Sequence, residues 1–462
     1  MSDYKNHQND SRRAEVNEKK ESSVSEIANS LVAFGRIQGA DEIEVAIIES
    51  SEFNVDVRFG EIENLVEAGS RALGFRIIKD KKTAIATSSD LTKETLQNLV
   101  KNAVKRSTLG NPDECAGLPP LRKTQIDIAS LKLFDPDISK LDSRKKISLA
   151  KETEKIALNE KKITNSHGAS FETRKIKIAL ANSNGFLKEY DETYCSLGIG
   201  LQAGDTDNKA EGFWSCSKRF LKELESPEMI ARKAVERTLR QLNPRKIKTQ
   251  NVPVIFEPMM TSWLLAFLFS CISGISIYQK TSFLVDKLGE KIGNKNVTVY
   301  DDGSIPGKIG SRPFDSEGVP VSKNTVIERG ILKNYLCNTY AARKLKLKST
   351  GNADANSVGP NNFYLQSGKT SPEEIIASTK RGLLLTRTIG HGLNPVTGDI
   401  SRGAFGLWIE DGKIAYPVSE ITISGNLGVI LNEIEIVGND LEFRSSFSGP
   451  TIKIKELTVA GK

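Results

Sequence analysis

Histidine is scarce in this chain of 462 residues, which contains only His7, His167 and His391. No two of these histidines are neighbours in sequence, so the close spacing typical of a histidine-based metal site is missing. A serine nucleophile has no local support either, because the chain contains no G-x-S-x-G elbow. These absences exclude the best-known sequence signatures of a hydrolase that works as a single chain.

Cysteine and long apolar runs are also sparse. The 5 cysteines lie far apart without a C-x-x-C pair, a pattern typical of a protein in the reducing cytoplasm. Residues 1–23 are polar and charged, so we expect a disordered tail, neither a secretory signal nor a membrane anchor. The most apolar run, Trp263 to Ile277, is shorter than the ~20 helical residues that span a bilayer. We therefore expect a soluble, cytoplasmic protein in which this run is a buried helix.

The charge is only mildly basic, with 65 Lys and Arg against 58 Asp and Glu. The basic residues are spread along the chain and are not clustered with interleaved aromatic residues, so they resemble solvated helix and strand faces. We therefore expect neither a membrane surface nor a nucleic acid as a direct partner.

Hydrophobic periodicity predicts a multi-domain α+β protein with antiparallel sheets. The residues from Val24 to Val32 place their apolar side chains on one helical face, whereas those from Phe53 to Phe59 alternate strictly, as in a strand with one wet face. Asn184-Gly185 predicts a hairpin turn, and Ser226-Pro227 predicts the start of a helix. We expect a tail at 1–23, an N-terminal α+β domain at 24–108, a linker at 109–136, a middle α+β domain at 137–246 and a large β-rich domain at 251–462.

The most informative stretch runs from Gly390 to Leu427. Its first part, Gly390 to Arg402, is a loop rich in turn-forming residues, and the alternation from Phe405 to Ile409 then predicts a strand. Asp411-Gly412 predicts a two-residue hairpin turn. Pro417 cannot donate a ladder hydrogen bond, so the returning strand should be a sheet edge or carry a bulge. An open edge there could capture an extended peptide, and the alternative is an ordinary hairpin with a long surface loop.

Three groups of motifs carry a family resemblance. They are the run Asn394-Pro395-Val396-Thr397-Gly398-Asp399 with Ser401-Arg402-Gly403-Ala404 and Glu420-Ile421-Thr422-Ile423, the pair Ser349-Thr350-Gly351-Asn352-Ala353 and Asn362-Phe363-Tyr364-Leu365, and the run Tyr278-Gln279-Lys280-Thr281-Ser282-Phe283-Leu284. From about Ile43 to the C-terminus the chain resembles the TldD/PmbA family. The resemblance implies a zinc metallopeptidase assembled from two related subunits.

The same resemblance separates the two subunit types. The catalytic subunit carries His-Glu-x-x-x-His on a helix of its third domain, and the matching segment here, Leu265 to Ser270, contains no histidine or carboxylate. The chain therefore resembles the PmbA (TldE)-type subunit, without catalytic residues, metal ligands or a cofactor of its own. The implied partner is a TldD-type paralogue that carries His-Glu-x-x-x-His and the zinc. The implied substrate is an extended or unfolded peptide.

Six residues of the C-terminal stretch are candidates for a peptide groove or a partner contact: His391, Asn394, Asp399, Ser401, Arg402 and Trp408. Hydrogen bonds within the loop are the alternative use of Asp399 and Arg402. Two other functions stay open. One is a metal-free peptide-binding or scaffold protein of the gyrase-modulator type, acting without a protease partner. The other is independent hydrolysis through His391 or a cysteine, for which the sequence offers no second catalytic group.

Overall fold

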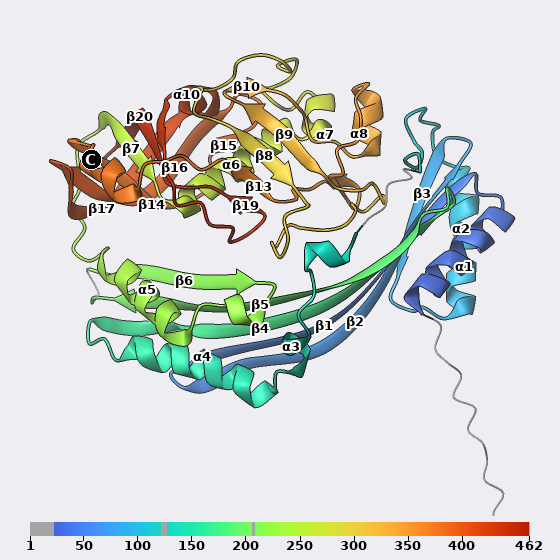
Figure 1. Ribbon diagram of the computed structural model, residues 1–462, viewed down its shortest axis with the longest axis horizontal. Helices are drawn as coiled ribbons and strands as arrows, with labels where there is room; N and C mark the ends of the chain where they lie inside the picture. The colour runs from blue at the N-terminus through green and yellow to red at the C-terminus, as the bar shows by residue number, and fades with distance from the viewer. Residues whose placement is uncertain (1–22, 122–126, 206–207, 462) are drawn as a thin grey trace, which may run out of the picture.

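The computed structural model describes residues 23–121, 127–205 and 208–461 (Figure 1). It confirms an α+β protein with antiparallel sheets and a β-rich C-terminal domain. His7 and the expected disordered tail lie outside the described residues, except for Ser23. That residue caps the first helix through a reciprocal pair of hydrogen bonds with Glu26.

A six-stranded antiparallel sheet runs through the first half of the chain in the order β3-β2-β1-β4-β5-β6. Its strands are β1 (Glu42–Arg58), β2 (Glu61–Lys79), β3 (Lys82–Ser88), β4 (Ile163–Asn182), β5 (Leu187–Ala203) and β6 (Ala210–Lys218). β1 pairs with β2 on one side and with β4 on the other, so the N-terminal and middle units share one continuous sheet.

The alternation of side chains along β1 explains how one strand serves both units. Ile43, Val45 and Ile47 pack against α1 (Val24–Ile37) and α2 (Lys93–Ser107). Farther along the same face, Phe53, Val55 and Val57 pack beneath α4 (Ser143–Leu158) and α5 (Pro227–Leu239). The two helix pairs therefore cover opposite ends of one face, which is the convex side of the curved sheet in Figure 1. Two short helical segments lie between these units, η1 (Ala129–Leu131) and α3 (Pro136–Lys140), and a third, η2 (Leu221–Glu223), joins β6 to α5.

The C-terminal domain contains a closed ring of strands. β7 pairs with β14 and β20, β20 with β17, β17 with β16, and β16 with β14. These strands are β7 (Gln250–Phe256), β14 (Arg381–Ile389), β16 (Asp399–Glu410), β17 (Lys413–Asn426) and β20 (Ile452–Ala460), and the ring is extended by β15 (Leu393–Asn394) and β18 (Ile434–Val437). Such closure removes exposed strand edges.

A second sheet packs beside the ring and shares its core. It is ordered β10-β9-β8-β13-β19, with bounds β8 (Val299–Asp302), β9 (Lys323–Glu328), β10 (Ile331–Leu332), β13 (Phe363–Leu365) and β19 (Phe447–Ser448). Between the ring and this sheet lies α6 (Pro258–Ile272). The smaller elements are β11 (Ala353–Asp354), β12 (Ser357–Val358), α7 (Gly274–Tyr278), α8 (Thr339–Lys344), α9 (Pro372–Ala377) and α10 (Leu427–Asn432). In the part of the chain that the structure describes, no helix combines the length and apolar character needed to cross a membrane.

The predicted hairpin at Asp411-Gly412 is confirmed. The returning strand β17 pairs with β20 only from Thr422 to Ser424, so its first part, with Pro417, has β16 as its one strand partner among the described residues, as expected for a sheet edge. β16 has β14 on one side and β17 on the other. On the far side of β17, the Arg245 N–H donates to the Pro417 carbonyl at 2.8 Å. The bulge, which was the alternative reading of the proline, is present because the β16–β17 register shifts on both sides of the Leu407–Pro417 pair.

Candidate functional site

The loop from Gly390 to Arg402 is held by its own hydrogen bonds. The Asn394 carbonyl accepts from the Gly398 N–H at 2.7 Å. The Asp399 carboxylate accepts from Thr397 Oγ1 at 2.6 Å and from Asn426 Nδ2 at 2.9 Å. These two donors hold the pKa of Asp399 below its usual value. Asp399 is therefore an ionised acceptor that fixes the loop, which is the alternative use expected from the sequence.

Two glycines of this loop are required by the fold of the loop itself. A Cβ at Gly392 would lie 1.8 Å from the Ser401 carbonyl oxygen, too close for any side chain. The two backbones are held this close by a hydrogen bond from the Ser401 N–H to the Gly392 carbonyl at 2.8 Å. Gly398 has φ +82°, and a Cβ there would lie 3.2 Å from the Phe283 ring. Backbone groups outside the loop hold it as well, because the Phe283 N–H donates to the Pro395 carbonyl at 2.9 Å and the Leu427 N–H donates to the Gly398 carbonyl at 2.7 Å. The loop is consequently a rigid surface feature.

Arg402 connects this loop to α6. Its guanidinium carbon lies 5.1 Å from the centre of the Trp263 ring, and its Nε donates to the Ile389 carbonyl at 3.4 Å. Trp263 is part of the helix that contains Leu265–Ser270, the segment that the sequence resemblance matched to the metal-binding motif of the catalytic subunit type. The stacking of a guanidinium on an indole ring is attractive and leaves the outer donors available.

The apolar side chains of α6 fill the core. Leu265, Phe267, Leu268 and Phe269 are all buried, and the Phe269 ring packs edge-on against Phe363 at 5.5 Å. Burial raises the pKa of the nearby Cys271 thiol to about 11. Within the described residues no three His, Cys, Asp or Glu side chains lie close enough together to hold a metal ion. The donor set of this helix does not fit zinc, which needs nitrogen, thiolate or carboxylate ligands.

The structure places five of the six candidate residues on the candidate loop and its short strands, and the sixth in the core. His391 is exposed between β14 and β15, Asn394 pairs with Asp399 across the β15–β16 ladder, and Ser401 and Arg402 follow on β16. Trp408 is only 1% exposed and lies in the core of the ring, so it cannot contact a peptide or a partner. Its strand periodicity was correct, but periodicity does not tell which face is covered.

His167, another of the three histidines, lies on a strand of the six-stranded sheet. It lies within β4, beside a bulge in the β4–β5 ladder, and its Nε2 is 3.9 Å from Glu211 on β6. Glu211 also contacts Arg387 of β14 at 3.4 Å. This small cluster therefore connects one end of the six-stranded sheet to the strand that leads into the candidate loop.

A second family-like region surrounds Asp301, which is fully buried on β8. Its carboxylate accepts from Asn352 Nδ2, Asn361 Nδ2 and the Asn361 N–H, each at 2.8 Å. Burial raises the pKa of Asp301 above its usual value, and these three hydrogen bonds oppose that shift. Asn352 of the resembling motif and the neighbouring Asn361 thus tie their loop to β8 of the second sheet.

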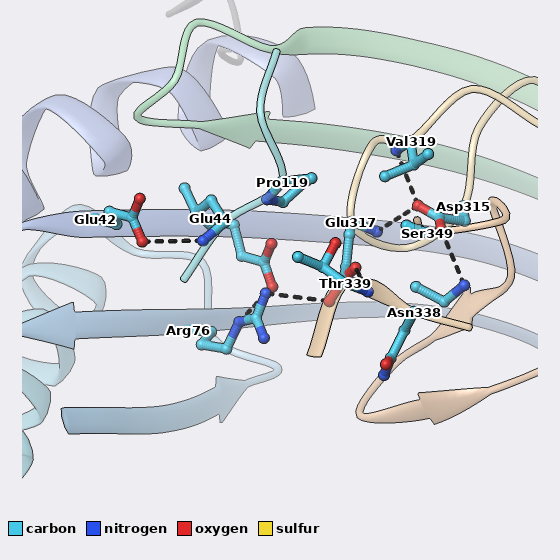
Figure 2. A network of polar contacts seen from close by, with 12 residues as sticks. Glu42, Glu44, Arg76, Pro119, Asp315, Glu317, Val319, Asn338, Thr339 and Ser349 are labelled. Atoms are coloured by element: carbon cyan, nitrogen blue, oxygen red, sulfur yellow. Dashed lines mark hydrogen bonds and ion pairs between the residues drawn. The ribbon is translucent and has the colours of Figure 1, made fainter. Parts of the chain in front are cut away.

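Sequence reasoning missed a buried polar cluster at the other end of the six-stranded sheet, formed by Glu44, Arg76, Asp315 and Glu317 (Figure 2). Arg76 Nε lies 2.8 Å from Glu44, and its Nη2 lies 3.4 Å from Glu317 of the C-terminal domain. Glu317 also accepts from the Thr339 N–H at 2.8 Å. One guanidinium therefore bridges a carboxylate from each side of the contact between the sheet and the C-terminal domain.

Burial dominates the electrostatics of this interdomain cluster. Desolvation raises the pKa of Glu44 to about 7, although Arg76 opposes the shift, and Glu44 Oε2 has no hydrogen-bond partner among the described residues. Burial also raises the pKa of Asp315 to about 7, and the neighbouring Glu317 adds to the effect. The sequence gives no sign of this cluster. Glu44 alternates with the apolar residues of β1, so it looks like any polar residue on the solvent-facing side of a strand.

Comparison with known proteins agrees with this architecture. Family models match three consecutive regions: PmbA/TldA metallopeptidase domain 1 over residues 43–107, the central domain over 136–242 and the C-terminal domain over 249–461. The Escherichia coli metalloprotease PmbA is 35% identical over 432 residues, covering 93% of this chain and 94% of that protein. A Haemophilus influenzae homologue of PmbA is 33% identical and covers 90% of this chain and 92% of its own length.

Solved structures with a similar fold also include members of this type. A candidate DNA gyrase modulator from Bacteroides thetaiotaomicron superposes with a TM-score of 0.88 at 27% identity, covering 95% of this chain and 98% of that chain. TldE from Thermococcus kodakarensis superposes with a TM-score of 0.80 at 26% identity, covering 94% and 99% of the two chains. The fold and the matched domains thus define a protein of the peptidase-related type. More specifically, the chain belongs to the TldD/PmbA family.

Proposed function

We propose that this chain is the metal-free subunit of a heteromeric metallopeptidase that degrades or trims peptides. The observation that carries the proposal is α6, where Leu265, Phe267, Leu268 and Phe269 occupy the core at the position of the catalytic subunit's metal-binding motif. A helix filled in this way supports the fold and supplies no ligand or general base. The zinc ion and the residues that hydrolyse the peptide bond are then supplied by a TldD-type partner.

The surface that supports a role in the complex is the rigid loop beside α6. His391, Ser401 and the guanidinium of Arg402 lie on it, together with the exposed apolar side chains Ile389 and Val396, which are 50% and 54% exposed. A fixed loop that presents both polar donors and apolar contacts suits an extended peptide or the rim of a partner's active site. Because β16 has no open edge, side chains and loop backbone would make these contacts, without strand pairing.

The first test is metal content. The purified chain alone should contain no stoichiometric zinc, and its mixture with a TldD-type paralogue should contain about one zinc per paralogue. Metal analysis that finds a tightly held zinc in the isolated chain would overturn the assignment of this subunit as metal-free.

The second test is activity. Co-expression with the paralogue should yield a complex that hydrolyses unfolded peptides and loses activity with a chelator, whereas this chain alone should be inactive. Hydrolysis by this chain alone that resists the chelator would instead favour independent catalysis through His391 or a cysteine. An inactive complex, or no complex, would favour the metal-free scaffold.

A further inference from the structure

The longest uncovered strand edge in the six-stranded sheet belongs to β2. β1 pairs with β2 along its whole length, but β3 pairs only with its second half, from Leu73 to Lys79. From Glu61 to Ala72, every residue except Val66 is exposed, and no described strand lies on the outer side. Twelve consecutive residues of this strand therefore present an open row of backbone donors and acceptors, along the lower border of the sheet in Figure 1.

The opposite border of the sheet shows what a protected edge looks like in this protein. There, Arg444 lies 4.1 Å from the centre of the Trp214 ring on β6, and its Nη1 donates to the Ser215 carbonyl at 3.4 Å. Lys233 of α5 approaches the same ring at 4.8 Å. The edge of β2 has no such cover among the described residues, and Glu61 to Ala72 contains neither proline nor lysine, two common protectors of strand edges.

Apolar side chains accompany this open backbone. Phe59 at the hairpin tip is 57% exposed, and Ile62 and Leu65 on β2 are 43% and 50% exposed. Because an exposed and partly apolar edge promotes association, its persistence in a folded protein argues for a specific occupant. A short peptide would find side-chain pockets only beside Glu67 to Arg71, because the residues from Glu61 to Val66 line neither of the two cavities next to this strand. A strand that is part of another folded sheet would bring neighbouring side chains that pack against both faces of β2.

The charge pattern selects between two kinds of strand. Glu61, Glu63 and Glu67 lie within eight residues that contain no basic side chain. Glu63 forms an ion pair with Arg58 at 3.5 Å, and Glu67 opposes the lowering of the Lys146 pKa by burial. A second copy of this chain would bring three more glutamates alongside these, and like charges on paired strands repel. A basic strand from a different subunit would be attracted.

We infer that the edge of β2 from Glu61 to Ala72 is the pairing surface for a basic edge strand of the zinc-bearing paralogue, so that the two sheets join across the subunit boundary. The inference rests on the proposed function for the identity of the partner. It adds the location and the chemistry of the contact.

The test uses the full chain and the paralogue. Hydrogen exchange should slow at the amides of 61–72 when the complex forms. The double variant Glu61→Lys/Glu67→Lys should weaken association at low salt by at least about tenfold, and the loss should shrink as salt is raised. The matched control Glu189→Lys/Glu456→Lys reverses two exposed glutamates away from this edge and should bind as the native chain does.

The outcomes separate the two proposals. A complex that forms and hydrolyses peptides without protection of 61–72, or with unchanged affinity in the double variant, overturns this inference and leaves the proposed function standing. Protection and weakened binding in a complex without hydrolysis support the edge and overturn the proposed function. If the native chains do not associate, both are overturned.

Discussion

Replacing Arg219 with alanine should loosen the C-terminal domain from the six-stranded sheet. Arg219 follows β6, and its side chain is only 5% exposed. Its Nε donates to the Lys308 carbonyl at 2.8 Å, and its Nη2 donates to the carbonyls of Ile309 and Ser311 at 2.8 and 2.9 Å. Its Nη1 meets Glu192 at 3.1 Å. A single guanidinium thus joins β5 to a loop of the C-terminal domain.

The magnitude follows from what the substitution leaves behind. Three carbonyl groups and one carboxylate lose their donor, and leaving a buried charge unpaired costs about 3–5 kcal/mol. Water that enters the space of the deleted side chain would recover part of the loss, so we expect about 4 kcal/mol for Arg219→Ala. Arg219→Lys keeps the charge but lacks the planar fork and should cost about half as much.

Urea unfolding, followed by fluorescence together with limited proteolysis of the native state, measures this effect. The transition of Arg219→Ala should move to lower urea, and the segment around Lys308 should become sensitive to protease. Arg232→Ala, which removes an exposed arginine on α5, is the matched control and should change stability by less than about 0.5 kcal/mol. A loss below about 1 kcal/mol for Arg219→Ala would refute the reasoning, because it would mean that the buried guanidinium holds no essential contact.

Three further predictions concern pH, the loop and the thiols. The pKa of folded Glu44 is raised from 4.5 to about 7, so its contribution to stability should be lost as pH rises from about 4.5 to 7, and urea unfolding of Glu44→Gln should show a shallower decline, by at most about 3 kcal/mol. The difference between the two pH dependences should be smaller than this limit, because 14% of the Glu44 side chain is accessible to water, which screens its charge. Arg402→Ala should lower peptide turnover by the assembled complex several-fold without changing the unfolding midpoint of this chain, and equal turnover would reduce the loop to a structural element. A thiol reagent should modify Cys115 first, because Cys115 is partly exposed whereas burial raises the pKa of Cys337 to about 12, and mass spectrometry of the labelled peptides checks the order.

The structure also changes how the loop should be probed. A substitution such as Gly392→Val would drive a side chain into the Ser401 carbonyl, so a loss of activity could come from a disrupted loop. Glu211 is also unsuitable as a neutral control, because it contacts Arg387 across the domain boundary. Arg402→Ala, compared with a substitution at Glu189, is the cleaner experiment.

Local signals in the sequence predicted the local elements well. The hairpin turns at Asn184-Gly185 and Asp411-Gly412 are both present, because Gly185, Asp411 and Gly412 tolerate the positive φ that these turns require. The start of α5 at Ser226 is also confirmed, since the serine side chain accepts from the Met229 N–H as an N-cap. Such features depend on a few neighbouring residues.

Long-range pairing was beyond the sequence. β1 pairs with β4 across more than a hundred residues, as in Val45 with Ala181, and nothing in either strand specifies that partner. Closure of the ring likewise depends on β14 pairing with β16, which leaves the strand before the Asp411-Gly412 turn without an open edge. For the same reason Trp408 was taken as a surface residue, and the interdomain cluster at Arg76 was not seen.

The contacts between the C-terminal domain and the sheet differ in their sensitivity to water from one end to the other. At the Arg76–Glu317 end, the two side chains are 18% and 3% exposed, whereas Arg387 and Glu211 at the other end are 30% and 52% exposed. Salt screens the exposed pair far more than the buried one. At high ionic strength the C-terminal domain should therefore separate from the sheet first at the Arg387–Glu211 contact beside the candidate loop. The buried Arg76–Glu317 contact should persist and act as the hinge.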